Sequence, residues 1–200
     1  MINHRIGPFA VFAACTLALP LTGCSESNSA SRVAATSPIE VTSTGSASEP
    51  GESAIPVDAL AKSSPASDSA RLTVTDVSVG HHEGFDRVVY ELGGMGTPGW
   101  RVDYVDTAVQ NGSGTPIPMS GKAILQVQID GSAYPFDSGV EGYSGPDPVP
   151  GIPGGSVTEV RGALVFEGVT QSFIGVAEPD RPFTVSALSG PPRVVVDIAN

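Results

Sequence analysis

The sequence predicts an all-β domain, a sandwich or a barrel, over residues 71–200. Three observations predict it. Short runs rich in Val, Ile, Leu and aromatic residues recur from residue 71 onward, separated by clusters of Gly, Pro, Asn and Asp. Several runs alternate apolar and polar residues with a period of two, as half-buried strands do, and no window sustains a helical period. A stretch of about 130 residues suits one domain.

Eight segments have the length and composition of strands, and turn signals such as Asn111-Gly112 lie between them. In the first segment, the apolar alternation shifts by one residue between Val74 and Val77, which predicts a β-bulge. The eight expected strands cover residues 72–79, 87–92, 99–105, 122–129, 157–166, 171–176, 183–188 and 193–198.

Residues 87–92 and 193–198 share the pattern Arg-Val-Val-apolar-acid-apolar. One face of each segment is wholly apolar and is expected to point to the core. We predict that the two strands pair antiparallel, because opposite charges then face each other and stabilise each pair by roughly 0.2–1 kcal/mol, whereas parallel pairing would put Arg beside Arg. The expected opposite pairs are Arg87 with Asp197, Val89 with Val195, and Glu91 with Arg193.

The segment 130–156 is long for a connection and holds seven glycines and five prolines. Long connections without regular structure are often binding loops, and Tyr143 is the candidate ligand contact within this one. A solvated excursion of the sheet accounts for the same composition equally well. Both interpretations stay open.

The first residues have the organisation of a secretory signal peptide, with basic His4 and Arg5 followed by a mainly apolar run over 6–21. This run is too short for a comfortable membrane span, which takes about 20 residues. The sequence Leu-Thr-Gly-Cys at 21–24 resembles the bacterial lipobox, in which the cysteine is acylated and becomes the new N-terminus. We expect a signal peptide over 1–23 and a lipidated Cys24, with palmitate among its two or three acyl chains, that anchors the protein in the bilayer.

This anchor would hold the protein at the extracytoplasmic face of the cell membrane. The alternative is a plain secreted protein cleaved near Gly23, which would leave Cys24 as a free thiol in an oxidising compartment, an unusual outcome. Residues 24–70 are rich in Ser, Ala, Thr, Glu and Pro and contain no aromatic residue, so we expect a disordered tether there.

Composition also restricts the chemistry of the mature domain. Cys15 lies in the signal peptide and Cys24 is taken by lipid, so no disulfide, thiol nucleophile or Cys-ligated metal is expected. Residues 71–200 hold seven Lys or Arg and fifteen Asp or Glu, a net charge of −8. Such an acidic domain is a poor partner for nucleic acid or for anionic lipid headgroups.

The sequence predicts no catalytic site, no cofactor and no metal. His81 and His82 are adjacent, so they point to opposite faces of an extended chain, and one is expected to pack on Phe85 or cap a backbone group. Ser113 lies in a Gly-Ser-Gly turn that lacks the spacing of a nucleophile elbow. Carboxylates for glycoside hydrolysis are present, but none stands out.

Trp100, Val102 and Tyr104 share one face of an expected strand. They could form an exposed platform for sugar rings, but a lone tryptophan in a small β-domain usually packs inside, which would turn Arg101 and Asp103 outward. The candidate ligand contacts are His82, Asp86, Trp100, Arg101, Asp103, Tyr104 and Tyr143.

Three stretches carry a family resemblance: Gly-His-His-Glu-Gly-Phe-Asp-Arg-Val-Val-Tyr-Glu at 80–91, Pro-Gly-Trp-Arg-Val-Asp-Tyr at 98–104 and Pro-Arg-Val-Val-Val-Asp-Ile at 192–198. With the glycine turns between them, they resemble the AMIN-like domain of actinobacterial lipoproteins and secreted proteins over 71–200. The resemblance implies a β-sandwich related to the AMIN domain, which targets cell-wall amidases and secretins to the envelope by binding peptidoglycan.

The resemblance carries over no catalytic residue. The expected function is therefore non-catalytic binding of peptidoglycan, another cell-wall polymer or an envelope protein, by a membrane-anchored lipoprotein. Two alternatives remain open: an envelope hydrolase with an unrecognised active site, and a structural or assembly subunit.

Overall fold

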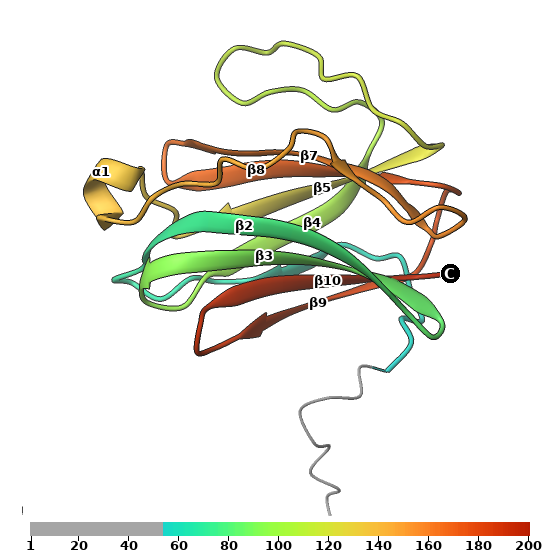
Figure 1. Cartoon of the computed structure of the whole chain (residues 1–200), viewed down its shortest axis with the longest axis horizontal. Helices are drawn as coiled ribbons and strands as arrows, with labels where there is room; N and C mark the ends of the chain where they lie inside the picture. The colour runs from blue at the N-terminus through green and yellow to red at the C-terminus, as the bar shows by residue number, and fades with distance from the viewer. Residues whose placement is uncertain (1–53) are drawn as a thin grey trace, which may run out of the picture. The chain divides into compact units, whose positions relative to one another are not determined.

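Two antiparallel sheets are stacked on each other in the computed structural model, which describes residues 54–200 (Figure 1). The elements are β1 (Lys62–Ser64), β2 (Arg71–His82), β3 (Phe85–Met95), β4 (Gly99–Val105), β5 (Ala123–Asp130), α1 (Pro135–Ser138), β6 (Val149–Pro150), β7 (Val157–Phe166), β8 (Val169–Val176), β9 (Phe183–Leu188) and β10 (Arg193–Ala199). One sheet has the order β1-β4-β5-β8-β7-β6 and the other β2-β3-β10-β9. The predicted all-β sandwich is confirmed.

The eight predicted strands correspond to β2, β3, β4, β5, β7, β8, β9 and β10, and β4, β7 and β9 have the predicted ends. The predicted bulge is confirmed, since the register between β2 and β3 shifts between Val74 and Asp76. The sequence did not predict β1, β6 or α1. These elements have two to four residues each, too few to show a period.

The predicted pairing of β3 with β10 is also confirmed, with Arg87 opposite Asp197 and Glu91 opposite Arg193. Arg87 donates from Nε and Nη2 to the two carboxylate oxygens of Asp197, at 2.7 and 2.9 Å. This hydrogen bonding raises the pKa of Arg87. At the other end, Arg193 donates through Nε to the carbonyl of Pro191. Within residues 54–200, the ladder therefore carries its ion pair at the Arg87 end.

The inner faces of the two sheets form the core. Tyr90 is fully buried and donates from Oη to Oγ of Ser172 at 3.0 Å, which joins the two sheets, and burial raises its pKa. Burying each large apolar side chain contributes about 1.5–3 kcal/mol. Apolar residues of both sheets with an exposure of 1% or less include Val88, Leu92, Val102, Leu125, Val127, Ile129, Ile174, Val176, Val194, Val196 and Ile198.

The tether was predicted to extend to residue 70. This boundary is wrong, because residues 54–70 belong to the folded unit. Strand β1 pairs with β4, with Lys62 opposite Val102. The ammonium of Lys62 forms an ion pair with Asp58 and lies 4.8 Å from the ring centroid of Phe183 on β9. The Phe183 N–H donates to the Asp58 carbonyl at 2.8 Å. This segment thus bridges β4 in one sheet and β9 in the other through backbone contacts that its composition does not reveal.

Residues 1–53 lie outside the described part of the chain. The predicted signal peptide over 1–23, Cys24 and the tether up to residue 53 all fall there. Within residues 54–200, no helix is long and apolar enough to cross a membrane.

Replacing Asp197 with Asn tests the ion pair between β3 and β10. The change removes the negative charge that pairs with Arg87 across this ladder, and we expect a loss of about 2 kcal/mol in the free energy of unfolding. This expected loss is smaller than for a deeply buried ion pair because the Arg87 side chain is 22% exposed. Urea titration measures it. The matched control is Glu91→Gln at the other end of the same ladder, where Glu91 lies opposite Arg193. An equal loss of stability in both variants would contradict a stabilising role for the Arg87–Asp197 pair.

Candidate functional site

His82 and Asp86 lie at the turn between β2 and β3. The His82 ring stacks on Phe85 with centroids 4.9 Å apart, which confirms the expected packing. Asp86 is fully buried, accepts from the Val157 N–H at 3.1 Å, and lies 2.7 Å from Nδ1 of His81. A carboxylate with no exposed surface is unsuited to the predicted ligand contact. Its contacts instead join the β2–β3 hairpin to the start of β7.

Trp100 and Tyr104 point inward and pack against the core, which confirms the preferred interpretation and excludes an exposed aromatic platform. Tyr104 donates from Oη to the Arg181 carbonyl at 2.9 Å and meets the Phe183 ring edge-on at 5.8 Å. Burial raises the pKa of Tyr104 to about 12, so the phenol stays neutral and remains a donor at physiological pH. Its role is structural.

The other two predicted residues of β4, Arg101 and Asp103, are exposed on the outer face of the six-stranded sheet. They face Gln128 and Gln126 on β5, respectively, across the ladder. These four side chains line a groove of about 330 Å³ beside β1. We call it the polar groove, and its full lining is Ala61, Lys62, Ser63, Arg101, Val102, Asp103, Val105, Gln126 and Gln128.

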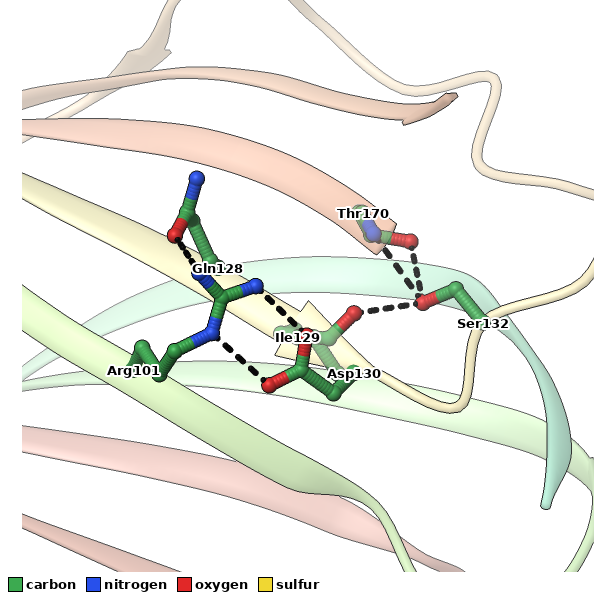
Figure 2. Close-up of polar contacts among 6 residues, drawn as sticks. All are labelled: Arg101, Gln128, Ile129, Asp130, Ser132 and Thr170. Atoms are coloured by element: carbon green, nitrogen blue, oxygen red, sulfur yellow. Dashed lines mark hydrogen bonds and ion pairs between the residues drawn. The ribbon is translucent and has the colours of Figure 1, made fainter. Parts of the chain in front are cut away.

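Three hydrogen bonds orient the Arg101 side chain at the edge of the polar groove (Figure 2). Its Nε and Nη2 donate to the two carboxylate oxygens of Asp130 at 3.0 and 2.7 Å, and its Nη1 donates to Oε1 of Gln128 at 2.6 Å. The hydrogen bonds to Asp130 raise the pKa of Arg101. Because Oε1 of Gln128 is taken, the Gln128 amide nitrogen points away from Arg101 (Figure 2).

Hydrogen bonds of Ser132 support the end of β5, where Asp130 lies. The Ser132 hydroxyl donates to the Ile129 carbonyl at 2.8 Å and lies 2.8 Å from the hydroxyl of Thr170 on β8. The Thr170 N–H donates to the same Ser132 oxygen at 3.1 Å (Figure 2). These buried contacts support the backbone on either side of Asp130, so the position from which Asp130 meets Arg101 is preorganised.

Asp103 lies in the groove with fewer constraints. One oxygen, Oδ1, accepts from the Tyr104 N–H at 2.8 Å. Among residues 54–200, no ion pair engages this carboxylate. Asp103 therefore keeps an acceptor and a negative charge for a ligand.

The segment 106–122 bounds the outer face on the side of β8. Gln171 on β8 donates from Nε2 to the Val109 carbonyl at 3.0 Å, and its Oε1 accepts from the Asn111 N–H at 2.8 Å. Figure 1 shows this segment rising above the six-stranded sheet. The outer face of β4 and β5 is thus flanked by β1 on one side and by this segment on the other.

Tyr143 lies elsewhere, in a second, more apolar recess of about 270 Å³. Its N–H donates to the Val74 carbonyl at 2.8 Å and its hydroxyl to the Pro146 carbonyl at 2.7 Å. The long segment 130–156 therefore does wall a recess. Its lining is Thr73, Val74, Tyr134, Pro135, Gly142, Tyr143, Ala163, Leu164 and Val165.

The polar groove is the better candidate site because it combines amide donors, amide acceptors and a charge without an ion-pair partner. Of the predicted ligand contacts, Arg101 and Asp103 are the two that line this groove. Gln126, Gln128 and β1 were not predicted; the outward alternation of β5 could have indicated the two glutamines. In the described part of the chain, no group of three or more His, Cys, Asp or Glu is placed to hold a metal ion.

Gly99→Ala tests whether β1 forms the wall of the groove by close backbone approach. A Cβ at Gly99 would lie 2.8 Å from the Ser64 carbonyl oxygen and closer still to the Ala66 nitrogen, so β1 must shift. We expect trypsin to cleave after Lys62 about tenfold faster in this variant. Gly80→Ala, whose Cβ would meet nothing closer than 3.8 Å, is the control. Equal cleavage rates would contradict this packing.

Comparisons with known proteins agree with the architecture. The family model of the AMIN-like domain matches residues 72–200, from the second residue of β2 to the end of the chain as given. No curated protein and no solved structure matches the chain. Since the family match covers more than half of the sequence, the chain belongs to the AMIN-like domain family.

Proposed function

We propose that this protein is a non-catalytic binding module for peptidoglycan, which it binds in the polar groove, and that lipidated Cys24 anchors it at the extracytoplasmic face of the cell membrane. Membership of the AMIN-like family supports a cell-wall binding role. The observation that carries the proposal is a groove with one hydrogen-bonded wall at Arg101, in which the Asp103 and Gln126 side chains are available to a ligand.

The chemistry of the groove suits an amino-sugar and peptide polymer. Such a polymer presents hydroxyls, acetamido groups and peptide bonds, which are neutral donors and acceptors. Glutamine amides match these groups in both directions, and a carboxylate accepts from hydroxyls and N–H groups. Because the Arg101–Asp130 pair holds one wall, little conformational entropy is lost on binding.

The proposed anchor is compatible with reaching the wall. Residues 25–53 lie between Cys24 and the first described residue, and a chain of that length spans at most about 100 Å when fully extended. Because residues 54–70 belong to the folded unit, this reach is shorter than that of the tether predicted from composition over residues 24–70. The anchor thus sets how far from the membrane the groove can operate.

A second candidate function is binding to an envelope protein through the apolar recess. Phe136, 82% exposed, stacks on Tyr134 with ring centroids 5.3 Å apart, and Leu164, 57% exposed, lines the recess. Exposed aromatic and aliphatic side chains at one site are typical of protein interfaces. Substitutions at Phe136 would then abolish partner binding without changing binding to the wall.

Co-sedimentation with purified peptidoglycan sacculi tests the main proposal. The chain Ser25–Asn200, which lacks the lipidation cysteine, is mixed with sacculi and centrifuged. We expect the wild type to sediment with them and the double variant Asp103→Ala/Gln126→Ala to lose about tenfold in affinity, since two hydrogen-bonding groups are removed. Glu91→Ala, on the outer face of the other sheet, should bind like wild type.

A wild-type chain that stays in the supernatant at both low and moderate salt would contradict wall binding. Equal sedimentation of the wild type and the double variant would contradict the assignment of the site to the polar groove.

A further inference from the structure

We propose that the polar groove recognises a primary ammonium group in the peptide part of the polymer, with Asp103 as its counter-charge. The inference rests on the proposed function and specifies which chemical group of the polymer is bound. It follows from the charges in the groove, the geometry around Asp103 and the acceptors beside it.

The lining of the groove contains three charged side chains, Lys62, Arg101 and Asp103. Both cations already have partners, since Lys62 is paired with Asp58 and Arg101 with Asp130. The charge of Asp103 is thus the one that remains uncompensated among the described lining residues. A ligand group that completes this site carries a positive charge.

The position of Asp103 also suits an ammonium. It lies on β4, between β1 and β5, where it faces Gln126 across the ladder. Its Oδ1 accepts from the Tyr104 N–H, which orients the carboxylate while Oδ2 remains available. An ammonium has three donors, and besides the carboxylate the lining offers two neutral oxygens, the Gln126 amide oxygen and the Ser63 hydroxyl.

The same distribution of charges in the groove disfavours an anionic ligand. A phosphate or carboxylate would be repelled by Asp103, and Arg101 and Lys62 would attract it weakly because each is already paired with a carboxylate. The chain as a whole has a net charge of −11, which also repels polyanions. Within peptidoglycan, the free amines of diamino-acid residues in the stem peptides are the cationic groups, and they are separate from the sugar hydroxyls.

Chemical modification of the polymer tests the inference. Sacculi are treated with acetic anhydride, which converts the free amines into neutral amides and leaves the glycan strands intact. We expect the wild-type chain Ser25–Asn200 to bind acetylated sacculi about fivefold more weakly than untreated sacculi at low salt, the scale of one exposed ion pair. The difference should shrink as salt is added.

Asp103→Asn keeps the acceptor for the Tyr104 N–H and removes the charge. This variant should bind both preparations equally, at the weak level of the wild type on acetylated sacculi. Glu91→Gln, with the same charge change on the outer face of the other sheet, is the matched control and should keep the fivefold difference. Thermal melting of all variants checks that the fold is retained.

Three results would overturn the inference. Equal binding of the wild type to both preparations would show that uncharged groups are recognised, and the proposed function would stand. A fivefold difference that persists in Asp103→Asn would assign the effect to general charge repulsion. Binding to neither preparation would overturn the proposed function as well.

Discussion

The antiparallel alignment of β3 with β10 is the constraint on which the rest of the sandwich depends. It places Arg87 opposite Asp197, where the guanidinium forms a two-point hydrogen-bonded pair with a carboxylate that is 5% exposed. A shift of one residue would bring the apolar side chains of these strands to the outer face and lose this pairing. With the register fixed, Tyr90 reaches Ser172 in the opposite sheet and sets how the two sheets meet.

Because side chains alternate along β4 and β5, one face of this pair of strands packs in the core and the other is open to a ligand. Inward residues such as Val102 and Val127 complete the core, and outward residues form the polar groove. The inward position of Trp100 shows why an aromatic residue alone is a weak indicator of a ligand site: in a small domain its area stabilises more inside than outside. The polar residues that remain outside, above all Asp103, are better candidates for ligand contacts.

The sequence predicted the features that depend on local alternation and missed those that depend on partners. Alternation gave eight strands and the bulge before Asp76, and the shared pattern of β3 and β10 gave their register. The sequence did not predict β1, because Lys62 is held by backbone pairing with β4 and by contact with Phe183, which is distant in the chain. Nor could it show that Asp86 is buried, because its partner Val157 lies far along the chain.

The central claim, that the polar groove is the binding site, is tested most directly by nuclear magnetic resonance. An isotope-labelled chain Ser25–Asn200 is titrated with soluble peptidoglycan fragments that retain a free amine. We predict that the largest backbone amide shift changes fall on residues 101–103 and 126–128. Shift changes centred on Tyr134 and Tyr143, at the apolar recess, would contradict it.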